Sequence, residues 1–170
     1  ASNVLDLDYN STLLVANIAA LIAFIPVGII STKVGRKKMV IAGVVMLGSA
    51  FLVAAFLSSG TPAAVMMVIF ALAGIGWATI NVNSFPMVVE LAKGGNVGRY
   101  TGFYYTASMA AQTLTPVLSG LCMDNFGMRT LFPYATVFVV LSLLSMLLVR
   151  HGDATPVKAK DASDYIPDVD

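Results

Sequence analysis

The chain has 170 residues, of which 58% are hydrophobic and 11% are charged, with a formal net charge of +1 and a mean hydropathy of +0.84. Soluble domains carry about 25% charged residues, so this composition cannot cover a water-facing surface with charge. The net charge gives no indication of a nucleic-acid partner, and one cysteine, Cys122, excludes a disulfide framework within the chain and a thiolate metal site. The composition fits a lipid bilayer as the surrounding medium.

Long uncharged stretches separate a few short clusters of charge. A helix needs about 20 apolar residues to cross about 30 Å of hydrocarbon, and each of these stretches is long enough to hold at least one such helix. The Ser58–Pro62 segment, rich in Ser, Gly and Pro, divides the longest stretch into two. The sequence therefore predicts an all-α integral membrane protein with five transmembrane helices, at about residues 10–31, 39–57, 63–91, 100–121 and 131–149.

Basic residues gather on one side of the predicted bundle, which covers residues 10–151. Nine of the ten Lys and Arg residues lie in the turn after the first span, in the loop after the third span or after the fifth span, and only Arg129 lies on the opposite side. Because cytoplasmic loops are enriched in Lys and Arg, we expect a multi-pass protein of the plasma membrane with a cytoplasmic C-terminus. Residues 1–9 are then an extracellular segment, and the polar, acidic residues 152–170 are a cytoplasmic tail expected to be disordered.

Polar side chains recur at helical spacing in three of the five spans. Since polar groups inside a membrane are costly, their placement indicates function or helix contact. The alternation of three- and four-residue steps lines up one face of the third span and one face of the fourth. We expect these faces to line a water-accessible cavity; the alternative is hydrogen bonding between neighbouring helices, worth about 0.6 kcal/mol each. The predicted cavity residues are Asn17, Trp77, Asn81, Ser84, Tyr105, Ser108 and Gln112.

The first basic turn resembles a signature of the major facilitator superfamily. It runs from Gly28 through Thr32 and Gly35 to Arg36 and Lys37, where the family has Gly, three residues, Asp, a basic residue, any residue, Gly and two basic residues. Thr32 stands at the Asp position, and this degenerate form suits the copy of the signature that follows the eighth helix. The resemblance implies that the chain holds most of one six-helix half of a twelve-helix transporter. Helices 2–6 and 8–12 fit the same pattern of spans, since the two halves are repeats, and the degenerate signature and the acidic tail favour helices 8–12. Because the chain has no initiator Met, we expect it to be part of a longer protein.

A second resemblance covers residues 83–90 and 98–105, which are similar to the corresponding region of sucrose-type and glycoside–cation symporters in this superfamily. It implies uptake of a sugar or glycoside coupled to protons or another cation. In related transporters an acidic and a basic residue at these helix ends form an inner gate, which suggests Glu90 with Arg36 or Arg99. The alternative is an ordinary interfacial pair between Glu90 and Lys93.

The sequence thus predicts a secondary active transporter that moves a small solute by alternating access, with the missing N-terminal half supplying the other face of the cavity. The alternatives are a major facilitator carrier of a non-sugar solute, such as a drug or an organic acid, and a self-contained five-helix membrane scaffold or accessory subunit. We expect no enzyme activity, because the spans hold no carboxylate or His at membrane depth. No cofactor or metal is expected, since no matching motif is present.

Overall fold

The structure, a computed structural model, describes residues 9–57, 61–92 and 96–150. The expected extracellular segment and C-terminal tail therefore lie almost entirely outside the described residues. The helices are α2 (Tyr9–Val34), α3 (Arg36–Phe56), α4 (Ala63–Leu91), α5 (Val97–Phe126) and α6 (Leu131–Leu148), with a short 3-10 helix η1 (Met128–Thr130) before α6. The described part contains helices and no strand, which confirms the all-α prediction.

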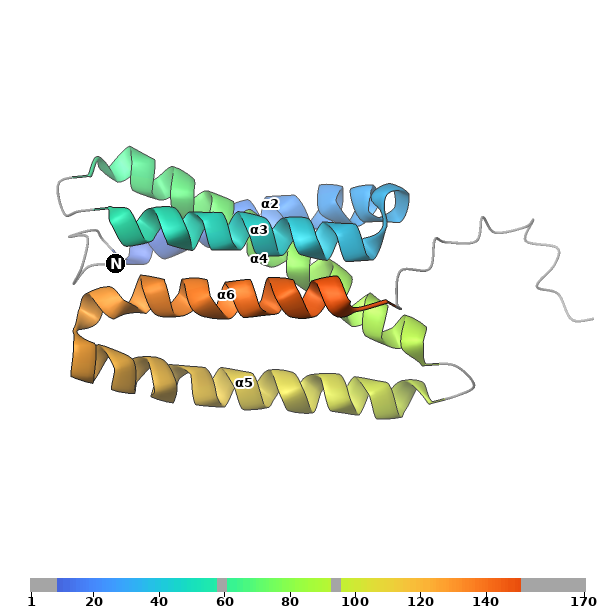
Figure 1. Cartoon of the computed structure of the whole chain (residues 1–170). Coiled ribbons are helices and arrows are strands. Elements are labelled where there is room, and N and C mark those ends of the chain that lie inside the picture. Colours follow the sequence, from blue (N-terminus) through green and yellow to red (C-terminus); the bar gives the residue numbers. More distant parts are fainter. Residues whose placement is uncertain (1–8, 58–60, 93–95, 151–170) are drawn as a thin grey trace, which may run out of the picture.

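Four of the five long helices are long and apolar enough to cross a membrane by length and composition. They are α2 from Asn10, α3, α4, and α6 together with η1. The remaining helix, α5, is the longest at 30 residues, but its face of hydroxyl and amide side chains lowers its hydropathy. In Figure 1, α5 and α6 run in opposite directions and are joined at one end through η1. The polarity of α5, rather than its length, separates it from the other four.

Helix α4 holds the bundle together, because it packs along both α2 and α3. Helix α3 also packs against α6. In Figure 1, α5 lies outermost. The described part of α5 contains no buried residue. The packed core is therefore made by α2, α3, α4 and α6, while α5 is held mainly at its ends.

Two close helix contacts depend on glycine. A Cβ built on Gly74 would lie 2.1 Å from the backbone oxygen of Ala16, so α2 and α4 approach as closely as their backbones allow. A Cβ on Gly43 would lie 2.8 Å from the backbone oxygen of Gly76, which sets the α3–α4 contact. In lipid, helices associate through such close packing of small residues rather than through a hydrophobic driving force.

The turn between α2 and α3 also depends on glycine. Gly35 separates the two helices with φ of 101°, in the region that glycine adopts at little cost. Its N–H donates to the carbonyl of Ser31 at 3.0 Å, and its carbonyl accepts from the N–H of Met39 at 3.2 Å. The basic residues of the signature therefore stand on a tight turn. We call the end of the bundle that carries this turn the basic end.

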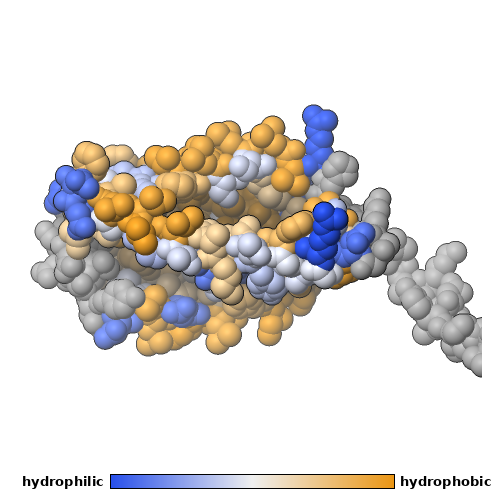
Figure 2. All heavy atoms as spheres, turned by 90° about the horizontal axis from the view of Figure 1, so that it is seen from below, coloured by the Kyte–Doolittle hydropathy of each residue, from blue (hydrophilic) through white to orange (hydrophobic). Residues whose placement is uncertain are grey.

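Hydrophobic and hydrophilic residues separate along the length of the bundle. Figure 2, seen from the side on which α5 lies, shows hydrophilic residues at the two ends and hydrophobic residues along both flanks. Paler residues of intermediate hydropathy run along the middle of this view. Exposed large apolar side chains cover the outer faces, for example Val137, Leu141 and Leu144 of α6. This distribution is that of a bundle surrounded by lipid, with water at its two ends.

Candidate functional site

The seven predicted cavity residues lie on α2, α4 and α5. Five of them are exposed in this chain: Asn17, Trp77, Asn81, Tyr105 and Gln112. Ser84 and Ser108 are half-buried. All seven residues therefore keep some side-chain surface exposed in this chain. On α4, the residues that pack against α3, such as Gly76, lie on an adjacent face, about 100° around the helix from Trp77.

The hydrogen bonds of these side chains stay within single helices. The Asn17 amide donates to the carbonyl of Leu13 at 2.9 Å, and the Asn81 amide donates to the carbonyl of Trp77 at 2.9 Å. Ser84 donates from its hydroxyl to the carbonyl of Ile80 at 2.6 Å, and Gln112 Nε2 donates to Ser108 Oγ at 3.1 Å. Among the described residues, the hydrogen bonds that these four amide and hydroxyl donors make therefore do not join one helix to another.

Aromatic contacts link the three helices that carry these residues. Phe24 of α2 meets Trp77 of α4 edge to face, with ring centroids 6.2 Å apart. Nearer the basic end, Phe85 of α4 contacts Tyr104 and Tyr105 of α5, with centroids 5.6 and 5.8 Å away. Such pairs stabilise a contact by about 0.5–1.5 kcal/mol beyond the area they bury. The aromatic contacts therefore join α2 to α4 at Trp77, and α4 to the first turns of α5 at the basic end.

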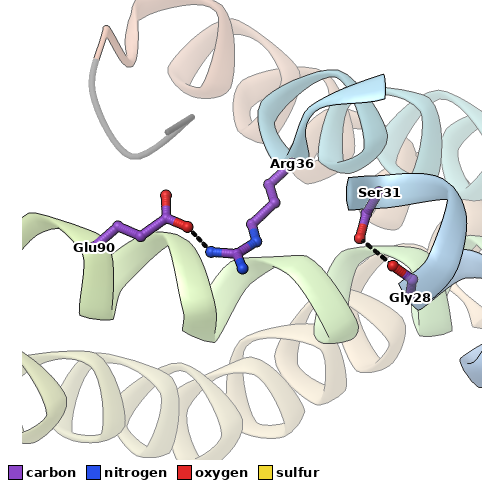
Figure 3. Close-up of polar contacts among 4 residues, drawn as sticks. All are labelled: Gly28, Ser31, Arg36 and Glu90. Atoms are coloured by element: carbon purple, nitrogen blue, oxygen red, sulfur yellow. Dashed lines mark hydrogen bonds and ion pairs between the residues drawn. The ribbon is translucent and has the colours of Figure 1, made fainter. Parts of the chain in front are cut away.

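The basic turn makes an ion pair with α4. Arg36, the first residue of α3, pairs through its guanidinium with the carboxylate of Glu90, near the last turn of α4 (Figure 3). Both side chains are largely shielded, with 27% and 21% of their side-chain surfaces exposed. The close-up also shows the Ser31 hydroxyl donating to the carbonyl of Gly28 at 2.8 Å, which keeps Ser31 within α2. Of the two basic partners predicted for Glu90, the structure pairs it with Arg36.

Arg99, the other predicted partner, lies elsewhere. Its guanidinium carbon stands 5.4 Å from the ring centroid of Phe103, one turn along α5, within the range of a cation–π contact. The alternative pairing of Glu90 with Lys93 involves a residue outside the described part of the chain.

Two further residues of the signature, Gly28 and Thr32, make only ordinary or local contacts. A Cβ on Gly28 would meet Val82 at 3.9 Å, an ordinary contact, so Gly28 is not needed for close helix approach here. The Thr32 hydroxyl donates to the carbonyl of Ile29 at 2.7 Å. The Thr32 hydroxyl therefore finds its acceptor within α2.

Sequence reasoning missed two features of this region. Asn83 of α4 is 1% exposed and donates to the carbonyl of Thr79 at 2.8 Å, while its Oδ1 atom accepts no hydrogen bond. Lys37 donates from Nζ to the carbonyl of Val149 at 2.6 Å and to that of Leu147 at 3.4 Å, at the end of α6. Asn83 is an amide beside the polar face of α4, so its presence in a membrane span could have been noticed in the sequence. Nothing in the sequence indicates the partner of Lys37.

Two apolar cavities lie between the helices. One, of about 280 Å³, is near the end opposite the basic end and is lined by side chains of α2, α3, α4 and α6, including Phe51, Phe70 and Phe132. The other, of about 230 Å³, is at the basic end between α3, α4, α5 and α6, and Ser84 and Tyr104 are its polar lining residues. Neither cavity holds a charged side chain. Within the described part of the chain, no group of His, Cys, Asp and Glu side chains could hold a metal ion.

Comparison with known proteins agrees with the membrane architecture. The profile of the Major Facilitator Superfamily matches residues 6–166. A curated relative from Metarhizium rileyi (strain RCEF 4871), described as "MFS-type transporter ppzB", is 24% identical over 142 residues, which is 83% of this chain and 29% of the relative. No solved structure matches the chain. The chain thus spans less than a third of the length of this relative, and it belongs to the Major Facilitator Superfamily of membrane transporters.

Proposed function

We propose that the chain forms part of a secondary active transporter and that the polar faces of α2, α4 and α5 contribute to its substrate cavity. One observation carries this proposal: within an apolar bundle, amide side chains on three helices are exposed and form hydrogen bonds only within their own helices. Exposing such groups to hydrocarbon is costly, since lipid offers no hydrogen-bond partner. A water-filled cavity that admits a solute satisfies these groups.

The opposite wall of this cavity comes from polypeptide beyond this chain. The chain spans 29% of the length of the curated relative, so a transporter of that size has ample further sequence. We place the chain as helices 8–12, with the N-terminal half facing the exposed surfaces of α2, α4 and α5. The basic end is then cytoplasmic and the protein is a multi-pass protein of the plasma membrane.

The solute that best fits the surface is a sugar or a glycoside. The rings of Trp77 and Tyr105, which are 50% and 49% exposed, can stack on the apolar face of a pyranose. The amides of Asn81 and Gln112 supply donors and acceptors for hydroxyl groups. Proton coupling requires a titratable group, and the acidic residues in the described part, Glu90 and Asp124, lie at helix ends. The coupling carboxylate therefore belongs to the remaining polypeptide.

Alternating access also needs a gate, and we assign one to Arg36 and Glu90. Their contact joins the first turn of α3 to the last turn of α4, and both side chains are more than two-thirds shielded. Opening the basic end requires this ion pair to break. Charge-assisted hydrogen bonds are stronger than neutral ones. The ion pair therefore stabilises the state that is closed at the basic end relative to the open state.

The experiment that tests the transport proposal is uptake of a labelled sugar panel into vesicles carrying the intact transporter, with and without an imposed proton gradient. We expect accumulation of a sugar or glycoside that the gradient stimulates. The variant that tests the cavity surface is Asn81→Leu, which keeps a side chain of similar size but removes the amide. We expect this variant to abolish uptake of that solute. If the inserted protein takes up drugs or organic acids and no sugar, the carrier function stands with another substrate class.

A further inference from the structure

Arg36 and Lys37 are consecutive residues, yet they bind two different helices. Arg36 pairs with Glu90 near the end of α4, while Lys37 Nζ donates to the carbonyls of Val149 and Leu147 at the end of α6, at 2.6 and 3.4 Å. The first turn of α3 therefore stands between the ends of α4 and α6 and holds both. We call these two contacts together the bracket.

The end of α6 suits a cation. The last four carbonyls of a helix have no N–H partner within it, and the helix dipole places partial negative charge there. Val149 is the C-cap residue of α6 and bonds through its own N–H to the carbonyl of Met146 at 3.3 Å. A lysine ammonium supplies donors to the remaining carbonyls and a compensating charge. The Lys37 contact thus satisfies backbone acceptors at the end of α6.

The helices held by the bracket are also packed together just inside it. Val40 and Val44 of α3 and Met87 of α4 form a buried cluster, against which Leu143 and Met146 of α6 pack. A closely packed interior transmits small displacements, so the contact between Lys37 and the end of α6 also limits the orientation of the first turn of α3. The position of the neighbouring side chain on that turn is limited with it. Arg36 is that neighbouring side chain.

We propose that Lys37 is a positioning residue for the Arg36–Glu90 gate. By holding the end of α6, it fixes the first turn of α3 in the orientation that brings the Arg36 guanidinium to Glu90. This inference rests on the proposed function, since it needs Arg36 and Glu90 to act as a gate. It adds that α6, which contributes none of the predicted cavity residues, stabilises the closed state at the basic end.

The test is the accessibility of the cavity from the basic side in the intact transporter. A cysteine is introduced at Ser108 in a background without other cysteines, and its labelling by a membrane-impermeant maleimide is timed from that side. We expect Lys37→Ala to accelerate labelling at least about threefold, since the closed state loses a charge-assisted contact. Lys37→Arg, which keeps the charge and the donors, should restore the original rate.

The matched control is Lys38→Ala, which removes an equal charge from the next residue, whose side chain is exposed. This variant should leave the labelling rate unchanged. Equal acceleration by Lys38→Ala and Lys37→Ala would show a general effect of charge and overturn the role of Lys37. An unchanged rate in Lys37→Ala would overturn it as well.

Glu90→Gln in the same assay separates this inference from the gate itself. If Glu90→Gln accelerates labelling and Lys37→Ala does not, the gate stands and the positioning role falls. If Glu90→Gln has no effect, the gate proposal fails, and Lys37 has nothing to position. In the double variant we expect no acceleration beyond that of Glu90→Gln alone; fully additive effects would mean that Lys37 acts by another route and would overturn the inference.

Discussion

The residues at the basic end show how a short motif acquires specific contacts. Gly35 provides a backbone turn with positive φ, and this turn presents Arg36 to Glu90. The identity of the turn could be predicted from its Gly and basic residues. That Glu90 pairs with Arg36 and not with Arg99 could not be predicted, because both arginines lie at the same end of the bundle. Only the three-dimensional packing separates them.

Exchanging the charges of the gate tests whether the ion pair itself matters. We expect Glu90→Arg to reduce the transport rate about tenfold without reducing the amount of inserted protein, since it opposes two positive charges. The double variant Arg36→Glu with Glu90→Arg should recover much of this loss. Rates are measured by initial uptake, normalised to surface expression. No recovery in the double variant would mean that the two side chains act separately.

The buried amide of Asn83 leads to a second prediction, about stability. Its Oδ1 atom is buried without a hydrogen-bond partner, and such an unsatisfied acceptor costs about 1–3 kcal/mol. Asn83→Leu has a similar volume and removes both this atom and the amide that bonds within α4. We expect thermal unfolding of the intact transporter in detergent to occur at an equal or higher temperature. A lower unfolding temperature would mean that Oδ1 has a polar partner in the intact protein.

Among the helices, the contacts of α4 determine the shape of the bundle. The number and approximate extent of the helices could be predicted from hydropathy, because each span must be long enough to cross the bilayer. Helix α3 begins at Arg36, three residues before the expected start, because the tight turn at Gly35 lets helical structure resume at once. Which glycines form helix contacts could not be predicted, since Gly74 and Gly102 look alike in a sequence but only Gly74 meets another backbone.

Two glycine substitutions test the close contact between α2 and α4. Gly74→Ala places a Cβ 2.1 Å from the backbone oxygen of Ala16, so we expect a loss of about 1–3 kcal/mol in the free energy of unfolding. Gly102→Ala in α5 is the matched control, because no atom lies within 4 Å of its added Cβ. This variant should be neutral or stabilised by up to about 1 kcal/mol through helix propensity. Equal stability of the two variants would contradict the packing described for α4.

For the whole molecule, the central question is what faces the exposed polar surface of α2, α4 and α5. The polar faces of α4 and α5 could be predicted from their three- and four-residue spacing, and four of the six predicted cavity residues on these two helices are exposed. The depth of the proposed cavity and its opposite wall could not be predicted, because the proposal assigns the residues that complete them to polypeptide beyond this chain. The same holds for the solute, since amides and aromatic rings suit more than one class of ligand.

The measurement that tests the account most directly compares the accessibility of two surfaces in the intact transporter. Single cysteines at Asn17, Asn81 and Gln112 probe the proposed cavity, and single cysteines at Val137, Leu141 and Leu144 probe the exposed apolar face of α6. Each is treated with a hydrophilic, membrane-impermeant maleimide. We predict rapid labelling at the first three positions and little at the other three, because only the cavity contains water. Equal protection of all six positions would contradict a water-filled cavity and leave the polar faces as contacts within the membrane.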